Sequence, residues 1–97
     1  MSWDATVLAE SDNVGMLLRP VLAGEQVTMT IGRIIVEMQA LEAIALCHKI
    51  ALRDIAAGDP VVKYGECIGE ATQRIPAGAW VHIHNLRSRR AQQGGSR

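Results

Sequence analysis

Residues 55–61 have the sequence Ile-Ala-Ala-Gly-Asp-Pro-Val: an apolar residue, two variable residues, a glycine, two variable residues and a second apolar residue. The same pattern recurs at 21–27 and at 75–81, and an imperfect copy covers 44–50. A tight turn commonly needs a positive φ, which costs glycine almost nothing but costs other residues about 1–2 kcal/mol. Each copy therefore predicts a strand, a turn and a second strand. We expect exposed turns, and a positive φ in two or more of them, at Gly24, Gly58 and Gly78.

The stretches between these turns are short and rich in β-branched residues, as in 61–64 and 81–84, which is typical of strands. Glycines and prolines after residue 50 leave no room for three turns of helix. Residues 34–46 are ambiguous: they begin with β-branched residues, which favour a strand, and continue with residues that a helix would accept. We prefer a strand there. Further strands are expected near 14–18, 49–53, 60–64 and 79–84.

The 97 residues support one hydrophobic core, and the balance of 48% apolar and 21% charged residues is that of a folded protein. We therefore expect a single all-β domain with short strands, tight glycine turns and little helix. The expected segments are an N-terminal extension at 1–10, the domain at 11–88 and a flexible basic tail at 89–97.

Charge and hydropathy argue against two classes of partner. Ten basic and ten acidic residues cancel, so the broad attraction used by nucleic-acid binders is missing. No apolar run reaches the roughly 18–20 residues of a membrane span, and the first residues do not resemble a secretory signal. We expect a cytoplasmic protein that binds neither nucleic acid nor membrane. The basic C-terminal end favours a solvated tail, with an anion- or RNA-binding tail as the alternative.

Histidines are the main candidates for chemistry. His82 and His84 are two residues apart, and on a strand they would point to the same face, about 6–7 Å apart, a workable spacing for one metal or one substrate. A plain surface pair is an equally good interpretation. His48 directly follows Cys47, the turn residue of its repeat copy, and all three histidines lie close to such turns, so a closed β structure could bring them together.

Other polar residues give weaker signals. Asp12 and Asn13 precede an apolar run, and they are typical of a turn that starts a strand. Lys49 and Lys63 have apolar neighbours, so they either lie against a structured surface or face water as ordinary strand residues. The thiols of Cys47 and Cys67 have no metal or redox spacing and are expected to be small buried side chains.

At this level of detail the sequence resembles a known family. The stretch 48–65, residues 68–69, residues 75–78 and the His-Ile-His-Asn of residues 82–85 resemble the N-terminal module of altronate and galactarate dehydratases. Asp12-Asn13-Val14 resembles the opening of that module, so the likeness runs from about residue 11 to residue 88. The family module is a small, folded-over all-β unit called a SAF-type β-clip, and the resemblance implies that fold.

In the long members of this family, a larger catalytic domain follows the module and uses a metal to remove water from a sugar acid. Relatives such as sulfolactate sulfo-lyase divide the two parts between a small and a large chain. The resemblance therefore implies a small subunit that is inactive alone and a large catalytic partner encoded nearby. That partner would hold most of the active site and a divalent metal, iron, and the substrate would be a hydroxy acid or sugar acid. Assembly into a homo-oligomer stays open.

The resemblance also implies roles for single residues. His48, His82 and His84 would be the acid/base groups, and His82 and His84 are the candidates for contacting a metal. The expected substrate-binding residues are Asp12, Asn13, Lys49, Lys63 and Asn85.

Two departures from the family pattern support an alternative function. Cys47 stands where the family has glycine, and Trp80 stands where it has a histidine. The loss of one histidine, together with a high apolar fraction for so short a chain, favours a ligand-binding or oligomerisation module without catalysis. A large partner chain encoded nearby would favour the lyase subunit instead.

Overall fold

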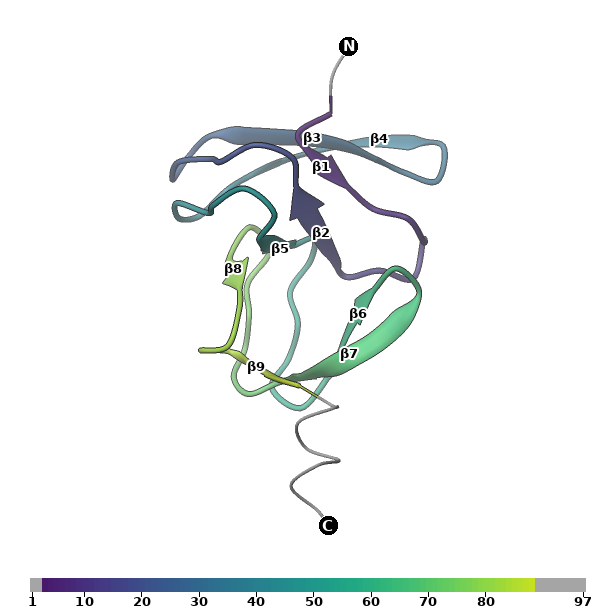
Figure 1. Ribbon diagram of the computed structural model, residues 1–97, viewed down its shortest axis with the longest axis vertical. Coiled ribbons are helices and arrows are strands. Elements are labelled where there is room, and N and C mark those ends of the chain that lie inside the picture. The colour runs from purple at the N-terminus through teal and green to yellow at the C-terminus, as the bar shows by residue number, and fades with distance from the viewer. Residues whose placement is uncertain (1–2, 89–97) are drawn as a thin grey trace.

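The computed structural model describes residues 3–88, and this part of the chain contains nine short strands and no helix (Figure 1). The all-β expectation is confirmed. The described residues include no helix that could cross a membrane. The strands are β1 (Ala5–Thr6), β2 (Val14–Leu17), β3 (Gln26–Ile31), β4 (Ile34–Gln39), β5 (Lys49–Ala51), β6 (Pro60–Lys63), β7 (Glu66–Ala71), β8 (Trp80–Val81) and β9 (Leu86–Ser88).

The strands form three antiparallel sheets. A central sheet has the order β1-β2-β5-β8, a hairpin consists of β3 and β4, and a third sheet has the order β6-β7-β9. Figure 1 shows the hairpin across one end of the molecule and the third sheet at the other, with the central sheet between them. The central sheet thus carries residues from both halves of the chain.

The core has two clusters of buried side chains, and the central strands contribute to both. On β2, Leu17 packs in the cluster beneath the β3–β4 hairpin, while Val14 packs in the cluster beneath β6 and β7. On β5, Ile50 and Ala51 divide in the same way. Because neighbouring residues of a strand point to opposite faces, the β2–β5 pair can fill both clusters at once.

Four turns repeat the same geometry, as the sequence pattern predicts. In each copy, a backbone N–H closes the turn onto the carbonyl three residues earlier, at 3.0–3.1 Å. The φ angles of the turn residues are 87° at Gly24, 69° at Cys47, 88° at Gly58 and 90° at Gly78. The positive φ expected for the glycines is confirmed, and Cys47 adopts it despite its Cβ.

The expected exposure is confirmed for Gly24 and Gly58 but is wrong for Gly78, which is buried. The loop after β4 covers Gly78, because the backbone N–H of Leu41 donates to its carbonyl at 2.9 Å. An added Cβ at Gly78 would lie 2.3 Å from the carbonyl oxygen of Gln39, whereas one at Gly58 would meet nothing within 4 Å. A buried turn therefore depends on glycine for space as well as for φ.

Asp12 and Asn13 are buried and tie the start of β2 to the β6–β7 hairpin. The Asp12 carboxylate accepts hydrogen bonds from the N–H groups of Gly65 at 2.8 Å and Ala9 at 3.3 Å. The Asn13 side chain accepts from the N–H of Val62 at 2.7 Å and donates to the carbonyl of Pro60 at 2.9 Å. Both side chains are thereby satisfied by the main chain, as buried polar groups must be.

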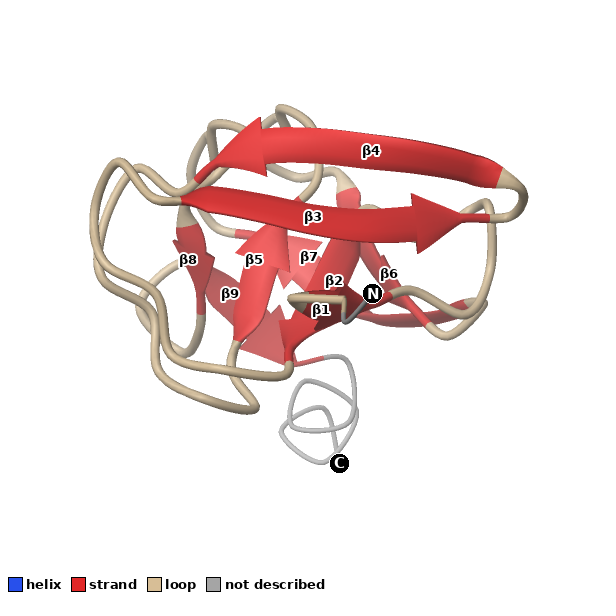
Figure 2. Ribbon diagram, turned by 90° about the horizontal axis from the view of Figure 1, so that it is seen from above, coloured by secondary structure: helices blue, strands red, loops and turns tan. Residues whose placement is uncertain are grey.

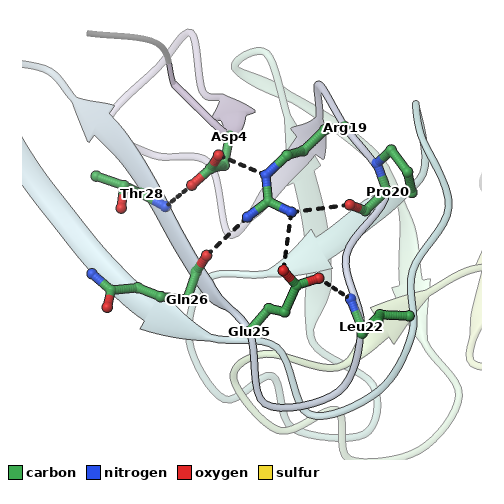
Figure 3. Close-up of polar contacts among 7 residues, drawn as sticks. All are labelled: Asp4, Arg19, Pro20, Leu22, Glu25, Gln26 and Thr28. Atoms are coloured by element: carbon green, nitrogen blue, oxygen red, sulfur yellow. Dashed lines mark hydrogen bonds and ion pairs between the residues drawn. The ribbon is translucent and has the colours of Figure 1, made fainter.

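The N-terminal residues belong to the fold earlier than the expected boundary at residue 11. Ala5 and Thr6 form β1 and pair with β2, and Ala5 is buried. Just before them, the Asp4 carboxylate accepts hydrogen bonds from Arg19 Nε at 2.8 Å and from the N–H of Thr28 at 2.9 Å (Figure 3). The expected flexible tail at 89–97 lies outside the described residues.

Each expected strand ends before its predicted last residue, and two end much earlier than expected. The strand predicted over 34–46 forms as β4 but stops at Gln39, after which only the single bridge between Val21 and Ile44 remains. The strand predicted over 79–84 forms as β8 but stops at Val81. Residues 82–85 make a turn, so the expectation of two strand histidines on one face is wrong in its geometry.

Alanine substitution of two glycines with the same φ should separate the cost of conformation from the cost of space. Gly58→Ala should lower the free energy of unfolding by about 1 kcal/mol, the cost of a left-handed residue with a Cβ. Gly78→Ala should lower it by about 3 kcal/mol, because its methyl group also displaces the backbone at Gln39. Urea unfolding measures both values. Equal losses at the two positions would contradict the packing described for Gly78.

Candidate functional site

Trp80 lies at the centre of a group of aromatic rings. The centroid of its indole is 5.6 Å from the ring of His48, 5.1 Å from that of His82 and 4.9 Å from that of His84. His82 stacks on the indole at an interplanar angle of 13°, and the rings of His48 and His82 are 5.0 Å apart. These four residues, here called the imidazole cluster, bring together two segments that are more than thirty positions apart in the sequence.

The indole of Trp80 also selects the tautomer of His48. Trp80 Nε1–H donates a hydrogen bond to His48 Nδ1 at 3.0 Å. A neutral imidazole has one N–H and one accepting nitrogen, so an accepting Nδ1 leaves the proton on Nε2. His48 can therefore offer Nε2–H as a hydrogen-bond donor. The sequence alone identified Trp80 only as the loss of a family histidine, and it gave no signal for this contact.

Two polar side chains hold Trp80 in place. The backbone N–H of Trp80 donates to Glu42 Oε2 at 3.0 Å, and its carbonyl accepts from Asn85 Nδ2 at 2.8 Å. Asn85 Oδ1 in turn accepts the backbone N–H of His82 at 2.9 Å. Asn85 is buried, and it fixes the turn that carries His82 and His84. The positions of the rings are thus set by main-chain hydrogen bonds and not by the rings alone.

Positive charge accumulates beside the cluster. Lys49 lies on β5, directly opposite Val81 of β8, and Lys63 is the last residue of β6. Partial burial of Lys49, followed by the charge of Lys63, lowers the pKa of the Lys49 ammonium. The ion pairs of the described residues join Arg19, Arg74 and Arg87 to acids, and none includes a lysine. A half-buried ammonium next to a second ammonium is stabilised by an anion.

The groups around His82 change the pKa of its imidazole ring. Loss of water around the ring, and then electrostatic interaction with the neighbouring groups His48, Lys49 and His84, lower the pKa of His82 below its ordinary value of 6.5. Its neutral form therefore predominates at pH 7. A neutral imidazole near neutral pH is suited to accept a proton.

The structure thus brings together some of the expected site residues and not others. His48, His82 and His84 meet around Trp80, with Lys49 near His82. The side chains of Asp12, Asn13 and Asn85 are buried and bonded to the main chain. Their contacts are structural, and a role in binding substrate stays a prediction. The chemical roles expected for the histidines and lysines are likewise predictions.

An apolar hollow adjoins the cluster, and it was not predicted from the sequence. It has a volume of about 440 Å³, and His48 and Trp80 form one of its walls. Leu22, which lines it, is 67% exposed. The remaining lining residues are Pro20, Val21, Ala43, Ile44 and Ala45. Two of the repeated turns therefore present apolar side chains to solvent directly beside the imidazoles.

The described residues do not form a metal site by themselves. Within residues 3–88, no three His, Cys, Asp or Glu side chains are grouped so that they could hold a metal ion. His82 and His84 instead pack against the indole of Trp80. Two imidazoles alone are too few for the four-ligand sites typical of tightly bound transition metals. A divalent metal at this surface would need ligands from another chain.

Comparison with known proteins finds one family and several relatives to which this chain is similar. A family model described as the altronate/galactarate dehydratase SAF domain matches residues 3–89. The (2R)-sulfolactate sulfo-lyase subunit alpha of Chromohalobacter salexigens is 36% identical over 94 residues, which cover 93% of this chain and 99% of that subunit. The altronate dehydratase of Bacillus subtilis is 38% identical over 79 residues, which cover 81% of this chain but 15% of the dehydratase. The altronate dehydratase of Escherichia coli is 39% identical over 77 residues, again 15% of its length.

The electrostatics of the cluster can be tested by titration. NMR titration of the imidazole protons should give His82 a pKa below 6.5, and Lys49→Met should raise that pKa by removing a positive charge. Because the folded-state pKa is depressed, the stability that His82 contributes is present above pH 6.5 and is lost as the pH falls through the folded-state pKa.

The matched control is Arg74→Met, which removes the same charge from a residue paired with Asp54 at 2.8 Å. It should leave the titration of His82 unchanged. A pKa of His82 at or above 6.5 in the parent chain would contradict the charge arrangement described here.

Proposed function

The chain belongs to the altronate/galactarate dehydratase SAF-domain family, and from this premise we propose that it is the small subunit of a lyase acting on a hydroxy acid or sugar acid. In this proposal, it supplies substrate-binding and acid/base groups to a site that a large partner chain completes. The bond cleaved would be a carbon–oxygen or carbon–sulfur bond, in line with the names of the relatives.

The observation that carries the proposal is the unpaired positive charge beside three imidazoles. Lys49 and Lys63 lack an ion pair within residues 3–88, and Lys49 is partly buried. A carboxylate bound between the two ammonium groups would relieve their repulsion and restore the ordinary pKa of Lys49. Hydroxy acids and sugar acids share such a carboxylate, which would be held next to the rings.

The imidazoles supply complementary proton chemistry for an elimination. One group must remove the proton next to the carboxylate, and another must assist departure of the leaving group. His82, whose lowered pKa keeps the ring neutral at neutral pH, is assigned the role of proton acceptor. His48, whose Nδ1 accepts the indole N–H, offers Nε2–H as a donor. Two titratable groups whose surroundings favour opposite roles are typical of acid/base sites.

Several features support a site that is shared with a second chain. The altronate dehydratases in which this module occurs are far longer, whereas the sulfo-lyase alpha subunit has nearly the length of this chain. The apolar hollow beside His48 offers nothing to a polar hydroxy acid, but it suits an apolar side chain of a protein partner. In this proposal the partner holds the divalent metal, iron, which would polarise the substrate when bound. No step assigned to the present residues depends on it.

The proposal predicts that activity requires two chains. The purified 97-residue chain should not turn over altronate, galactarate or sulfolactate, even with ferrous ion, while its complex with the large chain encoded nearby should act on one of them. In that complex, His48→Ala should lower kcat about 100-fold, the usual loss on removing an acid/base group. Its free energy of unfolding should change by less than about 1 kcal/mol, because His48 is only half-buried.

The control is Gln73→Ala, at an exposed loop position outside the imidazole cluster, which should leave both quantities unchanged. Robust turnover by the small chain alone would contradict the need for a partner. Full activity of the His48→Ala complex would show that the imidazole cluster is not used in catalysis and would favour the non-catalytic binding module.

A further inference from the structure

The outer edge of β4 is open in the part of the chain that the structure describes. Within residues 3–88, β3 is the only strand that pairs with β4 (Figure 2). The pairing continues without a register shift from Ile31 and Ile34 to Gln26 and Gln39. A regular edge strand of six residues presents unpaired backbone groups that can bond to another strand.

The opposite edge of the hairpin is closed, as Figure 3 shows. Asp4 donates its backbone N–H to the carbonyl of Thr28 at 2.8 Å and accepts the N–H of Thr28 on its carboxylate at 2.9 Å. Arg19 donates to the carbonyl of Gln26 at 3.2 Å. The edge of β3 is thus occupied by the chain's own residues, which leaves β4 as the edge available to a partner.

These contacts also show which residues of β4 direct their backbone outward. Thr28 lies opposite Glu37, and because its N–H and C=O are bonded to Asp4, the Thr28/Glu37 pair is one that exchanges no hydrogen bonds. Such pairs alternate with bonded pairs along an antiparallel ladder. Ile35 and Glu37 therefore point their N–H and C=O groups to the open side.

The first two side chains of β4 are apolar and exposed, although an open edge strand usually carries features that prevent pairing with another chain. Ile34 is 68% exposed and Ile35 is 58% exposed. Natural edge strands are commonly guarded by lysine, proline or a bulge. β4, with the sequence Ile-Ile-Val-Glu-Met-Gln, has none of these. Two adjacent exposed isoleucines on an open edge indicate a surface that becomes covered.

We propose that β4 pairs antiparallel with β4 of a second copy of this chain, about a two-fold axis at Ile35. In this register, Ile35 lies opposite the partner's Ile35, and Ile34 lies opposite the partner's Val36. Arg33, which directly precedes β4, lies opposite the partner's Glu37. Each interface therefore contains two such ion pairs around a central apolar contact, and the two hairpins form one four-stranded sheet. The surface is self-complementary, as an isologous dimer requires.

Charge distinguishes this register from its neighbours. An axis at Glu37 would place two like charges directly opposite each other, which destabilises an antiparallel pair. An axis at Val36 would place Arg33 opposite Gln39 and Ile35 opposite Glu37, without an ion pair. Of these three registers, only the one with its axis at Ile35 places each Arg33 opposite a Glu37. Within the monomer, the Glu37 carboxylate also accepts a hydrogen bond at 2.6 Å from Nε2 of Gln26, which lies on β3 of the same hairpin.

The dimer surface is separate from the imidazole cluster. The cluster residues come from β8, from the turn before β5 and from the turn after β8, and none comes from β3 or β4. Pairing through β4 is therefore independent of whether the cluster acts on a hydroxy acid.

Charge reversal tests the proposed register. At about 100 μM, where a contact with a micromolar Kd is largely formed, sedimentation should give the parent chain twice its 10.5 kDa mass. Arg33→Glu or Glu37→Arg alone should shift the chain to monomer, because each places like charges opposite one another. The double variant Arg33→Glu/Glu37→Arg should restore the dimer. Circular dichroism and thermal unfolding of each variant show that the fold is retained.

A cross-link provides a second, independent readout. Ile35→Cys should form a disulfide-linked dimer on mild oxidation, because bonded antiparallel partners have Cα atoms about 5.5 Å apart, within disulfide reach. Gln39→Cys, on the same strand and face, should not, since its two copies would lie roughly 26 Å apart. A parent chain that is monomeric at this concentration would overturn the proposal. So would a failure of the double variant to recover the dimer, or equal cross-linking at both positions.

Discussion

The buried pair Asp12 and Asn13 is the constraint on which the arrangement of the two halves depends. Its side chains bind the main chain of the β6–β7 hairpin, and the Asn13 carbonyl accepts the N–H of Leu52 just after β5. These bonds fix β2 between the two core clusters. Asp12 and Asn13 are buried and their bonds to the backbone are partly buried, so loss of either side chain would remove hydrogen bonds that each contribute about 1 kcal/mol. The site inherits its geometry from this arrangement, since the backbone of Leu17 on β2 bonds to Cys47 and His48.

The repeated turn determines where the chemistry lies. The turn at Cys47 delivers His48, the turn at Gly78 delivers Trp80, and antiparallel pairing of β5 with β8 brings these two residues side by side. Trp80 then provides a stacking surface for His82 and His84 and a hydrogen-bond donor for His48. A tryptophan at this position therefore changes how the imidazoles are organised, and it does more than remove a histidine.

Local rules were sufficient for much of the fold. The turn pattern predicted the positive φ values of the glycines, and β-branched residues predicted β4 and β6. Long-range contacts explain the failures. Gly78 is buried because the loop after β4 packs on it, and β8 ends at Val81 because Asn85 captures the backbone of His82. The substrate-binding role expected for Asp12 and Asn13 from their place in a family motif stays a prediction, but their observed hydrogen bonds connect segments some fifty residues apart. Sequence spacing contains no information about such partners.

We propose that the imidazole cluster and its lysines face a large partner chain. The most direct measurement is an NMR footprint of that chain on the small subunit. Binding of the large chain should perturb the rings of His48, Trp80 and His82 and the residues of the adjoining hollow, while the Glu70–Arg87 pair between β7 and β9 stays unchanged. A footprint confined to β7 and β9, with the imidazole signals unaltered, would contradict it.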